Sequence, residues 1–294
     1  MDDICKKYYK PFNNVRGLPQ DYKDVLIYPL LLKDYETYSK ISTYFTLIKN
    51  QIPDKDIIKM SMLKFILYIY QPQMNEYLKQ NNKEIINISK EIVDIFKLIL
   101  KPKIGELKDI LIEYSLRNPM DDIIATYQDL NLKMKLKIHL IYYFNFEERV
   151  ITLTENDFDN IREIILEQNG ISLEHLNQYD PTLEDSLMFL YKNDDSATFE
   201  EQIFSFGEIM KMHPDDVCNK FTFYQFKKYI DRMNLRINYE LLMPLEKSGQ
   251  ISLKKGKIEH WLSHIPNKGR YDDLLIKKDD FVKDNDVFKV SKTK

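Results

Sequence analysis

The sequence predicts an α+β fold in which helices dominate and a small antiparallel β region lies near residues 104–153. Two observations support this prediction. Over most of the chain, apolar residues recur every three or four positions, which is the spacing of one buried helical face. From Leu132 to Tyr142 they recur at every second position, with lysine or histidine between them, as in a strand with one solvated face.

These patterns divide the chain into four regions. Residues 1–103 are expected to be mainly helical, residues 104–153 to form the β region, and residues 154–266 to form a C-terminal helical domain. Residues 267–294 form a charged tail, whose isolated apolar residues would bury too little surface to offset the entropy cost of ordering it. From its length of 294 residues, we expect the chain to form two subdomains, and we expect the charged tail to be flexible.

The first region begins irregularly, because prolines and a glycine interrupt residues 1–23. A short strand is expected from Val25 to Tyr28. Apolar side chains at helical spacing then predict helices over residues 34–50, 54–71 and 85–99. The second of these helices is apolar on nearly all sides, so we expect it to be the buried element of this half.

The β region is expected to contain three strands. The alternating segment from Leu132 to Tyr142 is one, Arg149 to Leu153 should pair with it as a hairpin, and Asp109 to Leu116 is a candidate third strand. Three strands with one apolar face need a helical layer on that face, and the neighbouring helices can supply it.

Capping signals define the C-terminal helices. A hydroxyl residue is followed three positions later by an acid or glutamine after Thr154, Thr198 and Thr222, so a helix should begin at each. Pro181 and Pro214 suit the first turns of two more helices, and Gly170 suits a left-handed helix end.

The helix after Thr222 is expected to be the longest, ending near Pro244 and Gly249. Its apolar stripe contains Phe223, Phe226, Ile230, Met233 and Ile237. A short extended piece is expected at residues 250–253, followed by a last helix from Ile258 to Ile265.

Composition argues against several classes of function. The formal charge is −3 and the pI is about 6.0, which does not favour a dedicated nucleic-acid binder or a protein of anionic membranes. With only Cys5 and Cys218, a disulfide framework is not expected and a reducing cytoplasm fits. The most apolar run, Met60 to Tyr70, is far shorter than a membrane span, so we expect a soluble protein.

The sequence does not predict a catalytic, cofactor or metal site. The seven glycines are too dispersed for a phosphate-binding loop, and no nucleophile elbow is present. His260 and His264 would share one helical face at a metal-like spacing, but they lack the glutamate of a zinc peptidase and a nearby third ligand. We therefore expect a non-enzymatic protein.

DNA binding is one alternative. The helices after Thr198 and Thr222 outline a helix-turn-helix, and residues 220–236 contain a cluster of lysine and arginine. Residues 199–247 as a whole are nearly neutral, whereas phosphate contacts normally require a larger basic footprint. A solvated basic face is the more common explanation of such a pattern.

The patterned helices also resemble a known group of proteins. The segments VITLTENDFDNIREIILEQNG, YDPTLEDSLMFL, FEEQIFSFGEIMKMHPDDVCNKFTFYQFKKYIDR and IEHWLSHIP are similar to proteins from the tail-gene modules of long-tailed bacteriophages and prophages of Gram-positive bacteria. Some of these proteins are tail assembly chaperones. The similarity covers residues 151–266 and, loosely, residues 25–29.

This resemblance implies a non-enzymatic role in the cytoplasm of the bacterial host. Its partners would be the apolar, helical tape measure protein and the tail tube protein. Five apolar side chains are candidates for the contact surface: Phe223, Phe226, Tyr229, Met233 and Trp261. The chain is larger than the small chaperones and has its own β region, which leaves open a structural virion component of the tail or baseplate.

Overall fold

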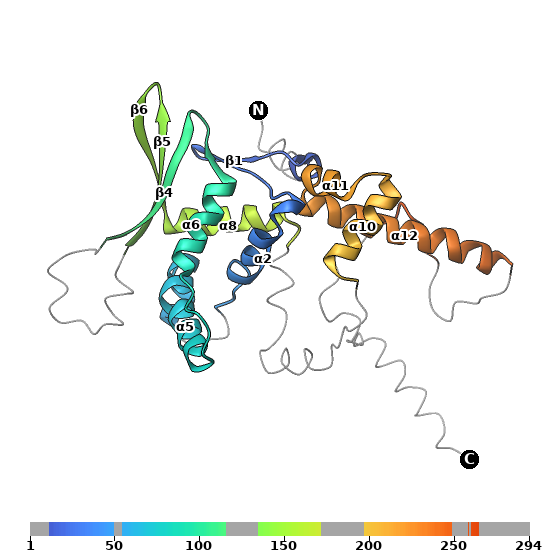
Figure 1. Cartoon of the computed structure of the whole chain (residues 1–294), viewed down its shortest axis with the longest axis horizontal. Helices are drawn as coiled ribbons and strands as arrows, with labels where there is room; N and C mark the ends of the chain where they lie inside the picture. Colours follow the sequence, from blue (N-terminus) through green and yellow to red (C-terminus); the bar gives the residue numbers. More distant parts are fainter. Residues whose placement is uncertain are drawn as a thin grey trace, which may run out of the picture.

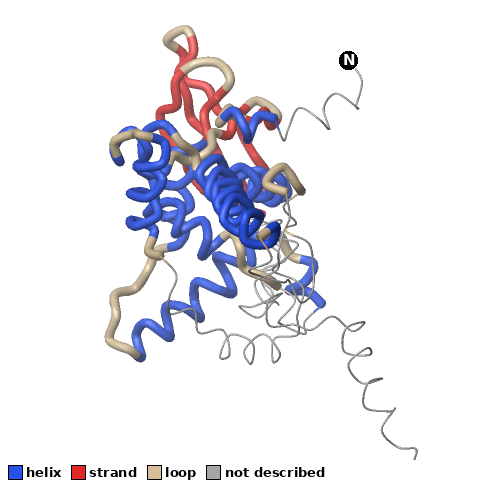
Figure 2. The backbone as a smooth tube through the Cα atoms, turned by 90° about the vertical axis from the view of Figure 1, so that its right-hand side faces the viewer, coloured by secondary structure: helices blue, strands red, loops and turns tan. Residues whose placement is uncertain are grey.

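The computed structural model describes residues 12–49, 55–115, 135–171, 197–248, 258 and 260–264. Within these ranges, helices and two three-stranded antiparallel sheets confirm the predicted α+β fold dominated by helices. The second of these sheets lies at one end of the molecule, and α12 (Phe223–Lys247) extends away from the other end (Figure 1). Figure 2 shows the strands above most of the helices.

The first sheet is built from strands of three residues, β1 (Gln20–Tyr22), β2 (Val25–Ile27) and β3 (Leu100–Pro102), in the order β1-β2-β3. The strand predicted at Val25 is confirmed. The irregular chain predicted over residues 1–23 is wrong where it is described, because residues 12–16 are helical and β1 pairs with β2. Strands this short form by pairing with neighbours and leave little periodic signal.

The helix predicted over residues 34–50 is shorter than expected. A 3-10 turn, η1 (Leu32–Asp34), precedes α2 (Tyr35–Tyr44), which ends well before Asn50. Arg162 explains this early end, because its guanidinium donates hydrogen bonds to the backbone carbonyls of Phe45 and, at 3.1 Å, Leu47. Backbone carbonyls that accept hydrogen bonds from a distant side chain do not need the N–H groups of a further helical turn as partners.

The helix predicted over residues 54–71 is divided into several elements. They are α3 (Lys55–Lys59), α4 (Met62–Lys64), a π-helical stretch η2 (Phe65–Tyr70) and α5 (Gln71–Gln80). Ser61 starts a new helix because its hydroxyl accepts a hydrogen bond from the Lys64 N–H. The expected burial is confirmed, since Leu63 and Ile66 are fully enclosed.

The helix predicted over residues 85–99 is present as α6 (Ile88–Ile99), which begins later than expected because the Asn87 side chain caps it by accepting from the Lys90 N–H. All three strands predicted for the second sheet are also confirmed, as β4 (Glu106–Ser115), β5 (Lys135–Phe144) and β6 (Glu147–Thr154) in the order β4-β5-β6. The inner face of this sheet is buried against helices. Its outer face carries the polar residues that alternate with the apolar ones.

The helix α8 (Glu155–Gln168) lies at the centre of the fold. Its predicted stripe of Phe158, Ile161 and Ile165 is buried, and the helix contacts α4, β2, β5, β6 and α12. The predicted cap at Thr154 is present, and Gly170 has the expected left-handed backbone with φ of 69°. A single hydrophobic core therefore includes residues from both sheets and from the helices before and after them.

The remaining predictions fall on residues that the structure does not describe. The helix starting at Pro181, the extended piece at residues 250–253 and the charged tail at residues 267–294 lie outside the described residues. The four regional boundaries stay a prediction. In the described ranges, no helix has the length and apolar character needed to cross a bilayer.

Asp157 joins the first sheet to α8. Its carboxylate accepts a hydrogen bond from the Tyr22 hydroxyl at 2.6 Å, pairs with the Lys23 ammonium at 2.5 Å, and accepts from the Thr154 backbone N–H at 2.8 Å. Burial alone would raise the pKa of Asp157, but the contacts with Lys23, Tyr22 and Thr154 together hold it well below its usual range.

Asp157→Asn is expected to destabilise the fold by about 2 kcal/mol at pH 7, because the buried site loses a charge-assisted hydrogen-bond network. Since the folded-state pKa is depressed, the contribution of Asp157 is present above pH about 4 and declines as the pH falls toward the folded-state value. The difference in unfolding free energy between wild type and variant should therefore shrink in acid. Urea titrations of the wild type and the variant at several pH values measure the two unfolding free energies. A comparable loss from Glu201→Gln, which removes an exposed capping carboxylate, would contradict the role of the network.

Candidate functional site

The C-terminal unit has the predicted order of helix, short helix and long helix. α10 (Phe199–Met210) and α11 (Pro214–Lys220) precede α12. Both predicted capping boxes are present: the Glu201 N–H donates to the Thr198 hydroxyl at 3.3 Å, and the Gln225 N–H donates to the Thr222 hydroxyl at 3.2 Å. These caps set where each helix begins.

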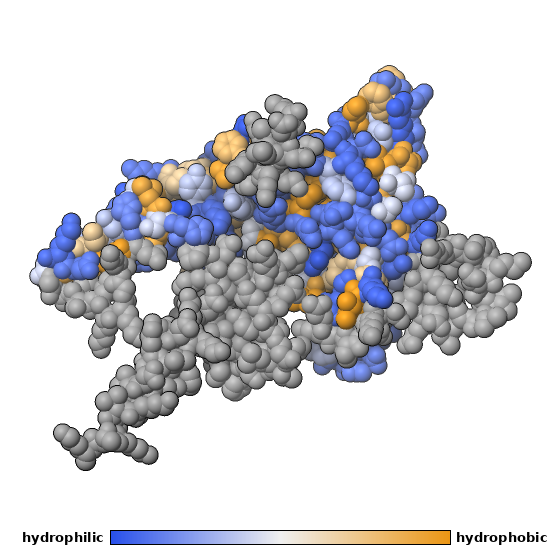
Figure 3. Space-filling view, turned by 180° about the vertical axis from the view of Figure 1, so that it is seen from behind, coloured by the Kyte–Doolittle hydropathy of each residue, from blue (hydrophilic) through white to orange (hydrophobic). Residues whose placement is uncertain are grey.

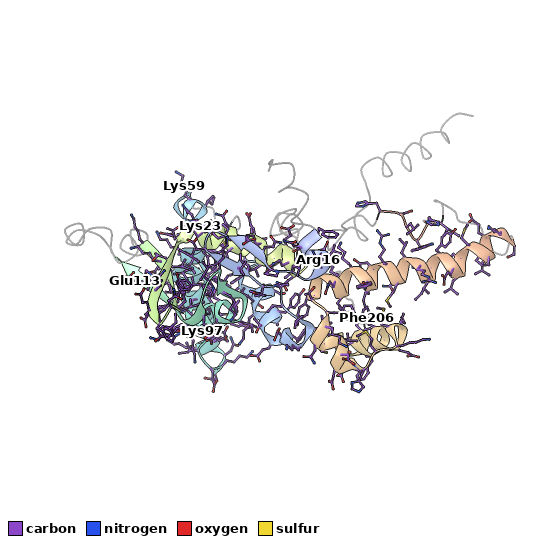
Figure 4. The ribbon with its side chains drawn as sticks, turned by 90° about the horizontal axis from the view of Figure 1, so that it is seen from above. Arg16, Lys23, Lys59, Lys97, Glu113 and Phe206 are labelled. Atoms are coloured by element: carbon purple, nitrogen blue, oxygen red, sulfur yellow. The ribbon has the colours of Figure 1, made fainter. Side chains whose placement is uncertain are left out.

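A group of packed rings holds the first turns of α12. We call it the aromatic anchor; its members are Tyr38, Phe199, Phe206, Phe223 and Phe226. Phe223 stacks on Tyr38 of α2 with ring centres 3.9 Å apart, and Phe226 meets Phe206 edge-on at 5.2 Å. Phe206 lies between α10 and α12 (Figure 4). The anchor therefore joins α12 both to α10 and to the N-terminal half.

Backbone contacts strengthen the same junction. The Leu32 N–H donates to the Phe221 carbonyl at 3.0 Å, and Leu31 forms a β-bridge with Thr222. The Gln225 amide donates to the Val15 carbonyl at 2.9 Å. The start of α12 is consequently fixed to the body of the protein.

Farther along α12, its apolar face is no longer covered by the aromatic anchor. Helical spacing places Ile237, Leu241 and Leu245 on the same side as the buried Phe223 and Phe226. The three side chains are 44%, 63% and 36% exposed, respectively. We call them the distal face. Apolar residues are visible among polar ones on this extending part of the molecule, at the left of Figure 3.

The structure separates the five predicted contact residues by burial. Phe223 and Phe226 belong to the core, and Met233 is partly buried beside it. Tyr229 is almost half exposed, with its ring close to those of Phe206 and Phe221. Only part of the predicted set therefore lies where a partner could reach it without rearrangement.

Trp261 lies on a different side of α12. Residues 260–264 form a turn, so the predicted helix from Ile258 to Ile265 is wrong over this described part. Arg232 accounts for the turn by donating to the carbonyls of Trp261 at 3.1 Å and Ser263 at 2.6 Å. Arg232 lies about 140° around the helix from Ile237, so Trp261 does not extend the distal face.

Sequence reasoning missed Leu241 and Leu245. Both follow Ile237 at four-residue intervals, so continuing the predicted stripe past Ile237 would have found them. Periodicity gives no indication, however, of where the stripe passes from buried to exposed.

Several charged residues in and near α12 form ion pairs or hydrogen bonds within the chain. Arg236 pairs with Glu240 and Lys220 with Asp216, each at 2.7 Å, and Lys227 donates to the Gly170 carbonyl at 3.1 Å. The Lys220 ammonium lowers the pKa of the Asp216 carboxyl. Among the described residues, no three His, Cys, Asp or Glu side chains are grouped to hold a metal ion. His260 and His264 do not share a helical face as their spacing suggested, because the segment is a turn.

Comparison with known proteins gives one similarity. The sequence model of the family described as the YomV second domain matches residues 192–266, which include α10, α11 and α12. This family is phage-derived, with YomV itself from a Bacillus prophage. No curated protein and no solved structure matches the chain. The match supports a phage-related protein.

Two substitutions on the same side of α12 test how its burial changes along the helix. Phe226→Ala should lower the unfolding free energy by about 3 kcal/mol or more, because it empties part of the aromatic anchor. Leu241→Ala should change it by less than about 0.5 kcal/mol, because the side chain is mostly exposed. Denaturant titration of both variants provides the measurement. Equal losses would mean that the distal face is buried in solution.

Proposed function

We propose that this protein is a non-enzymatic, chaperone-like assembly protein of phage tails, which binds an amphipathic helix of the tape measure protein on the distal face of α12. The principal supporting observation is that one apolar face of α12 is buried by the aromatic anchor near its start and exposed farther along. A partner helix with its own apolar stripe would complete the interrupted packing.

The chemistry of the distal face suits a helical client. Ile237, Leu241 and Leu245 recur every four residues, and ridges at this spacing can pack against grooves of another helix. Charged residues of both signs flank them, with Arg236 already paired to Glu240. This arrangement favours apolar contact over attraction by net charge.

The resemblance of residues 151–266 to tail-module proteins and the phage-derived family match agree with this proposal. The same surface could hold a partner transiently or within a finished tail. A transient chaperone and a structural virion component therefore differ in whether the protein stays with the particle.

Co-expression with the tape measure and tail tube proteins of the same tail module tests the proposal. The wild-type chain should keep the tape measure protein in the soluble fraction and elute with it on size exclusion. Mass spectrometry of purified particles then separates a chaperone, which should be absent, from a virion component, which should be present. Absence of binding to both partners and absence from particles would overturn the proposal and make salt-sensitive DNA binding the next possibility to test.

A double variant tests the assigned surface. Ile237→Lys with Leu241→Lys should reduce recovery of soluble tape measure protein by about tenfold, because two ammonium groups would enter the apolar contact. The melting temperature should stay within about 2 °C of wild type, since both positions are exposed. Tyr77→Lys on α5 is the matched control, because it also replaces an exposed apolar helical residue. If the control loses as much client as the double variant, the assignment to α12 is wrong.

A further inference from the structure

The sheet β4-β5-β6 has two edge strands that differ in protection. The β4 edge has an irregular register between Leu107 and Asp109, includes the charged Lys108, and contacts α6. Bulges, lysines and covering helices are devices by which natural proteins keep sheet edges from pairing with other chains. The β4 edge is therefore guarded.

The β6 edge has less protection, since its helix contact is with α8, which directly follows it in the chain, and its charged residues lie in its first half. Its pairing with β5 runs without a shift from Glu147 opposite Phe144 to Thr154 opposite Lys137, and its sequence EERVITLT contains no lysine or proline. In the described part of the chain, β5 is the one strand that pairs with β6. The hairpin of β5 and β6 rises away from the helices (Figure 1). Alternate backbone N–H and C=O groups of β6 consequently point outward without a strand to receive them.

We propose that two copies of this chain associate by antiparallel pairing of β6 with the β6 of the second copy, which joins their sheets into one. This interface is isologous, because each copy contributes the same strand. The pairing satisfies outward backbone groups on both edges at once.

Symmetry restricts the register of this pair. A two-fold axis between two antiparallel strands is perpendicular to the sheet, so it keeps each side chain on the same face of the sheet. Because side chains alternate between the two faces, the sequence numbers of two residues that face each other must differ by an even number. A register centred on Val150 places Val150 opposite Val150, Glu148 opposite Thr152 and Arg149 opposite Ile151. No two charged residues face each other. A register centred on Ile151 would bring Glu147 opposite Glu155, just beyond the strand, and is disfavoured.

The side chains near this axis suit a second copy. Val150 is 53% exposed and is paired with Ile141 on β5, so the two make a short apolar strip on the outer face of the sheet. In the register centred on Val150, the strips of the two copies meet and cover each other. Cross-strand contacts between β-branched residues stabilise such pairs.

The expected dimer is weak, because a single strand pair makes an interface below the roughly 1,200 Å² of stable complexes. Sedimentation velocity of the full chain should show reversible dimerisation with a dissociation constant of about 10 to 100 µM. A wild-type chain that stays monomeric up to about 500 µM would overturn the proposal.

Val150→Lys should raise the dissociation constant by about tenfold or more, because two ammonium groups would face each other across the axis. Leu111→Lys is the matched control: Leu111 is 50% exposed on the outer face but belongs to β4, so dimerisation should be unchanged. Equal weakening by both variants would contradict the β6 interface.

A charge exchange distinguishes pairing from a general defect in folding. Val150→Lys and Val150→Glu should each be mainly monomeric alone, and a mixture of the two should form heterodimers because opposite charges then face each other. A mixture that remains monomeric would overturn the assigned register. The β6 interface shares no residue with the distal face of α12, so these experiments do not decide whether the proposed assembly role is correct.

Discussion

Packing of Phe223 and Phe226 within the aromatic anchor determines the direction in which α12 leaves the protein. Each buried phenylalanine contributes about 2 to 3 kcal/mol through burial, and each favourable ring pair adds about 1 kcal/mol. The same rings connect α12 to α2 and α10, while the bridge between Leu31 and Thr222 fixes its N-cap residue. The remaining turns of α12 continue in the same direction because an α-helix is stiff. Its 25 residues span about 37 Å, long enough to extend well beyond the supporting body.

The two candidate interaction surfaces follow from this architecture. α8 is covered by the second sheet, α4 and α12, so the core is closed around it. Exposed apolar side chains include those on the distal half of α12 and on the outer face of the sheet beside β6. These two elements lie at opposite ends of the molecule (Figure 1). A partner helix and a second sheet edge can therefore bind without competing for the same residues.

Signals that reside in a short stretch of sequence predicted the fold well. The capping boxes at Thr154, Thr198 and Thr222 are present, because each depends on two residues three positions apart. The central strand of the second sheet was found by its alternation. Two errors arose where a distant side chain ends or replaces a helix. Arg162 ends α2 by bonding to Phe45 and Leu47, and Arg232 holds residues 261–263 in a turn. No local pattern encodes these contacts.

The candidate surface was only partly predictable for a related reason. Phe226 and Leu241 lie on one helical face and share its spacing, but one is buried and the other is mostly exposed. Whether a helical face is covered depends on what packs there, which one segment of sequence cannot specify. The sequence therefore identified the helix and its apolar face, and the structure located the exposed part.

Site-specific photo-crosslinking is the most direct test of the assembly role. A photoreactive phenylalanine analogue would replace Leu241 in a chain co-expressed with the tape measure and tail tube proteins, with the same replacement at Tyr77 as the control position. The account predicts a crosslink from position 241 to a helical segment of the tape measure protein and none from position 77. Equal crosslinking from the two positions, or none from position 241 while the two proteins still co-purify, would show that the client binds elsewhere.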